Sequence, residues 1–187
     1  MEELAQKWKR LALIEMEDRK VDLSRDKKKL NIVLAAKFFN RRSLNVEAVA
    51  KTFRPLWRTR GNFEVSDRGD NILLIAFELE VDAEKVIQGV PWAFDRHLVA
   101  FQRYDGSGPV KDLCFDKSVF WVQIHNLPFA LMMMEVVVSI GETLGTMVKP
   151  KDVGEMKGGS FMRVRVEVAI SKPLLRGRRI SWNQSEG

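Results

Sequence analysis

Two short apolar runs constrain the fold of this chain more than any other feature of its sequence. Residues 30–39 (LNIVLAAKFF) and 72–78 (ILLIAFE) are short enough to be strands that are buried on both faces. Of the 187 residues, 45% are hydrophobic and 30% are charged. This composition supplies a hydrophobic core and excludes a disordered basic tail.

Helix and turn signals around these runs predict the order of elements in a first domain. Asn45 is a good N-cap for a helix, and Pro55 should end or bend that helix. Asp82 can cap a second helix, which Gly89 closes. Further strands are expected at residues 63–66 and 98–104, with a hairpin turn at residues 68–71. Residues 29–105 are therefore predicted to form a ferredoxin-like, RRM-like β-α-β-β-α-β domain.

A polar connector at residues 106–118 leads to a predicted second unit, a β-α-β-β arrangement over residues 119–187. Its elements are expected at residues 119–127, Leu131–Leu144 (the helix), 146–151 and 161–170. The last strand alternates cleanly. Its inward residues are Met162, Val164, Val166, Val168 and Ile170, and its outward residues are Arg163, Arg165 and Glu167. We expect an α+β fold in which this unit packs on the first.

The N-terminal segment, residues 1–28, is expected to be an amphipathic helix followed by a charged linker. Leu4, Trp8 and Leu11 recur at helical spacing. Residues 1–26 carry thirteen charged side chains, so this start is neither a signal peptide nor a membrane span. We therefore expect an intracellular protein, nuclear or cytoplasmic, without a membrane partner.

Charge is distributed unevenly along the chain. The total is +6, but residues 27–70 carry eleven basic and four acidic side chains and residues 119–187 carry nine and six. Residues 71–118, between these blocks, carry five basic and eight acidic side chains. Clustered basic residues suit a polyanion, because neutralising phosphates releases counterions. A solubilising face remains the alternative interpretation.

Four motifs resemble a plant domain family of unknown function, DUF4283. They are Trp57, residues 89–98 (GVPWAFDRHL), residues 120–128 (FWVQIHNLP) and residues 172–179 (KPLLRGRR), within a match expected from Lys29 to Trp182. The family occurs in LINE-type, retrotransposon-derived proteins, typically upstream of a CCHC zinc knuckle. The resemblance implies nucleic-acid binding of the kind that coats element RNA. We expect the knuckle to be absent here, because two His and one Cys are too few for a zinc site.

A conventional RNA-recognition surface is not expected on the first sheet. Such surfaces stack bases on aromatic side chains of two central strands. Ile72 and Leu74 are expected at those positions on one strand, and Ile32 and Leu34 on the other. An exposed apolar sheet is a liability, so the N-terminal helix or the second unit should cover this face.

Phosphate contact by arginine is the favoured chemistry, because guanidinium groups match phosphate oxygens bidentately. The candidate nucleic-acid-binding residues are Arg163, Arg165, Lys172, Arg176, Arg178, Arg179, Arg54, Arg58 and Arg60. A weaker basic patch adds Lys27–Lys29, Arg41 and Arg42 to the last three of these. The alternative is a solvated edge on which Glu167 pairs with Arg165.

The other notable side chains are interpreted as structural. The five tryptophans are mostly core, and Trp57, which is flanked by arginines, is the one that could stack on a base. His97, His125 and Cys114 have no partners suited to catalysis. No glycine-rich phosphate loop and no set of nucleophile, base and acid is present, so we expect no enzyme, no cofactor and no small-molecule substrate.

Two functions follow from these expectations. The first is a non-enzymatic, largely sequence-independent module that binds RNA or single-stranded DNA. The second is a protein-interaction domain, a possible homo-oligomer through the apolar Leu131–Leu144 helix, with nucleic-acid contact left to a downstream zinc knuckle.

Overall fold

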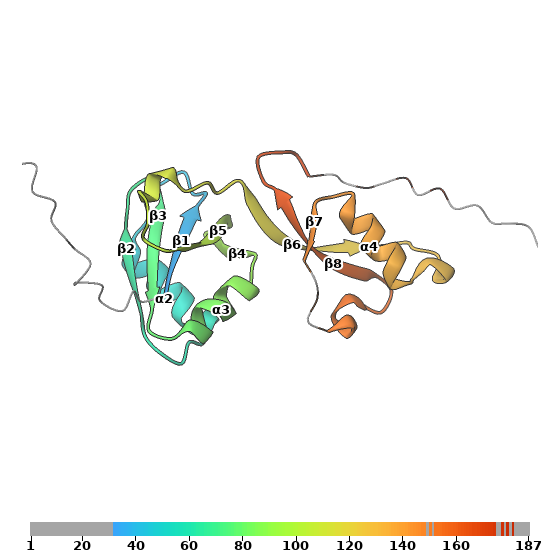
Figure 1. The fold of residues 1–187 in the computed structure, drawn as a ribbon, viewed down its shortest axis with the longest axis horizontal. Helices are drawn as coiled ribbons and strands as arrows, with labels where there is room; N and C mark the ends of the chain where they lie inside the picture. The colour runs from blue at the N-terminus through green and yellow to red at the C-terminus, as the bar shows by residue number, and fades with distance from the viewer. Residues whose placement is uncertain are drawn as a thin grey trace, which may run out of the picture. The chain divides into compact units, whose positions relative to one another are not determined.

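The computed structural model describes residues 32–148, 150, 152–174, 177, 179 and 181 (Figure 1). The expected helix and linker of residues 1–28 lie outside these residues, and so do Lys27–Lys29, Arg176 and Arg178. The described chain has an α+β fold with three α-helices and two antiparallel sheets, one of five strands and one of three.

The first sheet is formed by residues 32–104. Its strand order is β2-β3-β1-β5-β4, and every neighbouring pair is antiparallel. The strands are β1 (Ile32–Phe38), β2 (Phe63–Asp67), β3 (Ile72–Phe77), β4 (Trp92–Phe94) and β5 (His97–Tyr104). The two apolar runs therefore become the neighbouring central strands β1 and β3. Strand β4 was not expected, and it pairs with β5 across a turn at Asp95 and Arg96, whose φ angles are 48° and 63°.

Helix α2 (Val46–Trp57) follows β1 and begins as its N-cap predicts, because Asn45 Oδ1 accepts a hydrogen bond from Ala48 N at 3.0 Å. Pro55 lies inside the helix, which continues to Trp57. The expectation that Pro55 ends the helix is therefore wrong. Proline has no backbone N–H, so the carbonyl group four residues before Pro55 receives no helical hydrogen bond. Pro55 is exposed, so this carbonyl group can bond to water instead.

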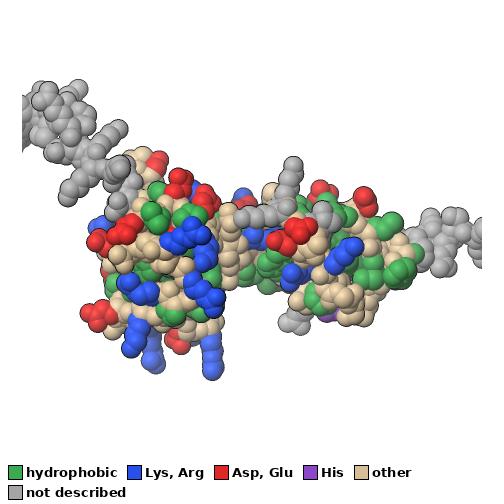
Figure 2. Space-filling model, turned by 90° about the horizontal axis from the view of Figure 1, so that it is seen from below, with side chains coloured by type: hydrophobic (Ala, Val, Ile, Leu, Met, Phe, Trp, Pro, Cys, Tyr) green, Lys and Arg blue, Asp and Glu red, His purple; other side chains and the backbone are tan. Residues whose placement is uncertain are grey.

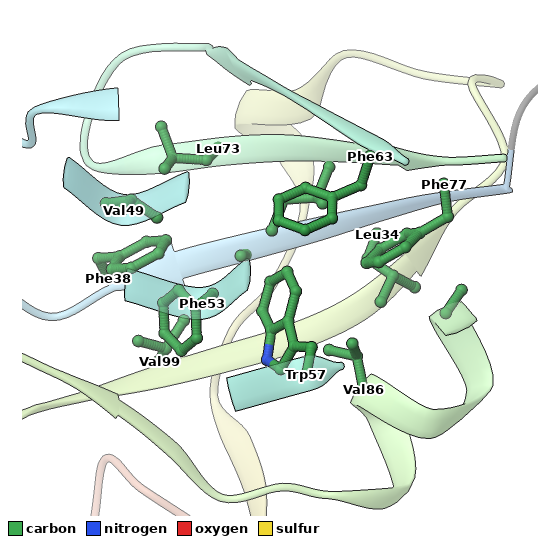
Figure 3. Close-up of a cluster of buried hydrophobic side chains, with 13 residues drawn as sticks. Leu34, Phe38, Val49, Phe53, Trp57, Phe63, Leu73, Phe77, Val86 and Val99 are labelled. Carbon is green, nitrogen blue, oxygen red and sulfur yellow. The ribbon is translucent and has the colours of Figure 1, made fainter. Parts of the chain in front are cut away.

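The first core lies between this sheet and its helices α2 and α3 (Glu80–Gln88), as Figure 3 shows. Val49, Phe53 and Trp57 recur every four residues on α2 and are all buried. Trp57 is 1% exposed and stacks on Phe53 with ring centroids 4.7 Å apart and planes at 19°. The expectation that Trp57 could stack on a base is therefore wrong, because its ring is part of the core.

Asp82 also has a different role from the one expected. The N-cap of α3 is Leu79, without a side-chain cap, and Asp82 lies within the first turn and is 2% exposed. Its carboxylate accepts hydrogen bonds from the backbone N–H of Arg60, 3.0 Å from each oxygen, and from Gly61 N at 2.9 Å. Asp82 thus fixes the loop after α2 to the start of α3.

The opposite face of the first sheet is apolar and mostly buried. Ile72 and Leu74 are each 8% exposed, which leaves little surface on which a base could stack. On β1, Leu34 packs in the helix-side core, so the assignment of Ile32 and Leu34 to the open face is wrong by one position in the strand. Leu113 and Phe115 of the connector line the same hollow as Ile72, so the connector covers part of this face.

The second sheet has the order β6-β8-β7, and both pairs are antiparallel. Its strands are β6 (Lys117–Ile124), β7 (Thr146–Val148) and β8 (Met162–Ala169), and its helix α4 (Met134–Glu142) is shorter than expected. Single 3-10 turns lie at Val110–Asp112, Phe129–Leu131 and Val153–Met156. Val137 of α4 packs in the same core as the alternate β8 residues, so α4 covers one face of this sheet.

The alternation predicted for β8 is confirmed from residue 162 to residue 168. Met162, Val164, Val166 and Val168 are buried, and the residues between them are half-buried on the other face. Ile170 lies in the turn after the strand and is half-buried. One face of β8 therefore forms the second core, and the other carries Arg163 and Arg165.

Candidate nucleic-acid interface

Two arginines and a tryptophan meet on the face of the second sheet that is opposite its core. Trp121 of β6 lies directly across from Arg165 of β8 in the strand register, and Gln123 lies across from Arg163. The Arg163 guanidinium carbon is 4.7 Å from the Trp121 ring centroid, and that of Arg165 is 5.6 Å from it. Both distances are within the range of cation–π attraction.

Each of these arginines also donates a hydrogen bond to a backbone carbonyl. Arg163 Nε donates a hydrogen bond to the backbone carbonyl of Glu155 at 2.6 Å, which leaves its two terminal nitrogens at the end of an anchored side chain. Arg165 Nη2 donates a hydrogen bond to the backbone carbonyl of Val90 at 3.4 Å, and Arg165 Nε is buried without a hydrogen-bond partner among the described residues. The Arg163 fork is therefore held in place before any ligand arrives.

Glu167 does not neutralise Arg165. Its carboxylate lies 3.8 Å from the ammonium group of Lys117, on the neighbouring strand. Neither Arg163 nor Arg165 belongs to an ion pair within the part of the chain that the structure describes. The positive charge of this face is thus available to an external anion, and the solvated-edge interpretation loses the partner on which it depended.

The other candidate nucleic-acid-binding residues of the second unit follow β8 in the chain. Lys172 is exposed in the turn that follows β8, and Arg179 is exposed as well. Arg176 and Arg178 lie outside the described residues. Of this group, the structure brings Arg163 and Arg165 together.

The expected residues of the first unit are spread around the end of α2. Arg54 lies over the Phe63 ring, with its guanidinium carbon 5.1 Å from the centroid. Arg58 and Arg60 line a hollow of about 380 Å³, but Asp82 and Glu84 line it too. The carboxylates reduce the attraction of this hollow for an anion, so it is a weaker candidate than the Trp121 face.

Trp121 is the candidate site residue that sequence reasoning missed. The sequence predicts a core position for it, because the run VFWVQI is apolar at almost every position. Gln123 was the available signal: it is two residues from Trp121 and therefore on the same face of the strand. A polar residue on that face indicates that Trp121 points away from the core.

A second surface feature lies beside α4. Phe129 is 92% exposed in the 3-10 turn before the helix, and Met133, the N-cap of α4, is 50% exposed. Met132, Met134 and Val138 pack against the second core instead. The apolar segment of residues 131–144 is thus partly core, and its exposed apolar part is concentrated at its start.

The described residues contain no helix that is long and apolar enough to cross a membrane. They also contain no group of three or more His, Cys, Asp or Glu side chains arranged to hold a metal ion. These two findings apply to the described ranges alone.

Residues 26–109 match the family model of a domain of unknown function, DUF4283. The matched segment covers the first sheet and the start of the connector, and this part of the chain is similar to that family. The motifs at residues 120–128 and 172–179 lie beyond the matched segment. No match was found among curated proteins or among solved structures.

Proposed function

We propose that this chain is a non-enzymatic module that binds single-stranded nucleic acid, RNA or DNA, with little dependence on sequence. We further propose that its first unit has the ferredoxin-like, RRM-like topology. The order β2-β3-β1-β5, with α2 between β1 and β2 and α3 after β3, supports this assignment. The DUF4283 match supports an origin in a retrotransposon-derived protein that coats element RNA.

The observation that carries the proposal is the Arg163–Trp121–Arg165 cluster, whose three side chains are half-buried on the sheet face opposite the second core. Arginine forks bind phosphate oxygens, and both bases and guanidinium planes stack on aromatic rings. A strand lying across β6 and β8 would place its phosphates at the terminal guanidinium nitrogens. Its bases would pack against the half-buried Trp121 ring or the arginine planes, and neither contact selects a particular base.

Binding of a fluorescently labelled U12 RNA and a dT12 DNA across a range of salt concentrations tests the proposal. If about six phosphates are neutralised, log affinity falls with log salt at a slope of roughly −4. Replacing Arg163, Arg165, Arg178 and Arg179 together by Ala should weaken binding to all sequences alike. Absence of binding at low salt, or a flat salt response, contradicts the proposal.

Phe129 and Met133 favour a second candidate, a protein-interaction or oligomerisation domain. An almost fully exposed phenylalanine next to an exposed methionine is a typical anchor for a partner surface. In this case a downstream zinc knuckle would supply the nucleic-acid contact. Light scattering distinguishes the two functions: a stable oligomer without affinity for RNA, which the double substitution Phe129→Ser and Met133→Ser dissociates, favours the second.

A further inference from the structure

A basic hollow of about 690 Å³ lies at the end of β1, in the part of the chain that holds the first sheet. Its cationic side chains are Lys37, Arg41, Arg42 and Lys111, and its acidic side chain is Asp70. A volume of this size is typical of sites for small organic ligands. On the face shown in Figure 2, Lys and Arg side chains project from the part of the chain that contains β1 to β5.

The loop that carries Arg41 and Arg42 is held in place from the β2–β3 hairpin. Asn71 Nδ2 donates hydrogen bonds to the backbone carbonyls of Asn40, at 2.8 Å, and of Arg42, at 3.0 Å. Asn71 has a φ of 55°, a conformation that asparagine tolerates better than most residues. Because Asn71 bonds the backbone, the two arginine side chains are left to face a ligand from a fixed loop.

The charges of the hollow are largely uncompensated. Lys37 Nζ donates a hydrogen bond to the backbone carbonyl of Asp70, which holds the ammonium group beside the hairpin without neutralising it. None of the four cationic side chains forms an ion pair within the described ranges. Four cations facing one carboxylate attract an anion, and two adjacent arginines suit the oxygens of a phosphate in particular.

The rest of the lining is apolar and aromatic. Phe39, 39% exposed, lies next to the arginine loop, and Ile72 and the half-buried Phe115 also line the hollow. A compact inorganic anion would leave this apolar part without a partner. A nucleotide satisfies both parts, since its phosphate meets the cations and its base packs on the aromatic wall.

We propose that this hollow binds the phosphate group of a nucleotide, with the adjoining base against Phe39 and Phe115. The site shares no residue with the Trp121 face, so binding at one surface can be tested independently of binding at the other. The nucleotide can be free, or it can belong to a strand, as its terminal or an internal unit. An acidic peptide is the competing occupant, which the aromatic wall and the arginine pair disfavour.

Titration of the full-length, ¹⁵N-labelled chain, followed by NMR, tests the site directly. The reporters are the Asn71 side-chain amide and the backbone amides of Arg41 and Arg42; the Trp121 indole N–H reports on the other surface. The probes are uridine, uridine 5′-monophosphate, hexaglutamate, and a uridine trinucleotide with either a 5′-phosphate or a 5′-hydroxyl. We expect the phosphate-bearing probes to shift the reporters of the hollow, and uridine and hexaglutamate to leave them in place.

The three sources of phosphate give different patterns. A free nucleotide is the ligand if the monophosphate binds as tightly as the trinucleotides. A strand end is the ligand if the 5′-phosphorylated trinucleotide binds tighter than both the 5′-hydroxyl form and the monophosphate. An internal phosphodiester is the ligand if the two trinucleotides bind alike and more tightly than the monophosphate. Each pattern supports the proposal.

The double substitution Arg41→Gln and Arg42→Gln should weaken binding at least about tenfold, because charge-assisted hydrogen bonds are lost. The double substitution does not change the backbone carbonyl groups that accept hydrogen bonds from Asn71, so the loop should keep its conformation. The matched control is Lys51→Gln with Arg96→Gln, which removes the same charge from two exposed positions outside the hollow. The proposal is overturned if the control loses as much affinity, if hexaglutamate shifts the same amides as strongly, or if no phosphate-bearing probe shifts them.

Discussion

The guanidinium carbon of Arg163 lies 4.7 Å from the centroid of the Trp121 ring, while Nε of the same side chain donates a hydrogen bond to the carbonyl of Glu155. Two contacts therefore hold a side chain that would otherwise sample many rotamers. An arginine that is already ordered loses less conformational entropy when it binds a phosphate. This preorganisation distinguishes Arg163 from exposed basic residues such as Lys172.

Replacing Trp121 by Ala should weaken binding of single-stranded nucleic acid. Loss of one stacking partner costs about 1–3 kcal/mol, or roughly fivefold to 150-fold in affinity. Trp121→Phe retains a ring and should lose less. Fluorescence anisotropy with labelled U12 measures both variants, and circular dichroism checks that each is folded. If Trp121→Ala binds with wild-type affinity, the Trp121 ring is not part of the binding surface.

Replacing Arg165 by Gln should change the salt dependence of binding as well as its strength. Each phosphate contact to a single strand contributes about −0.7 to the slope of log affinity against log salt, so the slope becomes less negative by about that amount. Lys51→Gln, which removes one charge from an exposed position on α2, should leave the slope unchanged. Equal changes in the two variants would indicate general electrostatic attraction instead of a defined contact.

Replacing Asp82 by Ala should lower the free energy of unfolding by about 2–4 kcal/mol, because the backbone N–H groups of Arg60 and Gly61 lose a charged acceptor. Urea denaturation measures the effect. Asp112→Ala is the control, since Asp112 is exposed and lies in a 3-10 turn of the connector. A loss below about 0.5 kcal/mol in Asp82→Ala would show that the loop does not depend on this carboxylate.

Replacing Gly145 by Ala should destabilise the second sheet. A Cβ atom at this position would overlap the carbonyl oxygen of Glu167 on β8, and relieving such overlap typically costs about 1–3 kcal/mol. A Cβ atom at Gly108 would meet no atom within 4 Å, so Gly108→Ala should be close to neutral. Thermal unfolding of the two variants gives the comparison, and similar melting temperatures would contradict the assigned packing.

Replacing Ser107 by Ala should raise the pKa of Asp105. The Ser107 hydroxyl and then its backbone N–H donate hydrogen bonds to this carboxylate and hold its pKa below the ordinary value of 3.8. A lowered pKa stabilises the folded state above the ordinary pKa, and this contribution is lost as pH falls through the folded-state value. Carbon-detected NMR titration of Asp105 follows the change, and an unaltered pKa would show that the hydroxyl group is not the cause.

Local patterns in the sequence predicted those features that depend on neighbours along the chain. The alternation of β8 places Arg163 and Arg165 correctly, because a strand with one buried face has a strict period of two. Asn45 is the N-cap of α2 for an equally local reason, a side-chain oxygen three residues before an unpaired N–H.

Features that depend on distant partners could not be predicted in this way. Asp82 looks like a cap in sequence, but its carboxylate bonds to N–H groups more than twenty residues earlier. Trp121 lies in an apolar run, and its exposure depends on which face of β6 meets α4. The basic hollow requires β1, the β2–β3 hairpin and the connector together, so no single segment indicates it.

The two faces of β8 restrict how this surface can change during evolution. Side chains alternate along the strand, so inserting or deleting a single residue would exchange the buried valines for the arginines. Point substitutions at Arg163 or Arg165 change the charge and hydrogen-bonding groups of one face while the valines stay in place. A lineage carrying this chain can therefore vary the chemistry of this face one residue at a time, whereas a change in the length of the strand would also disturb the second core.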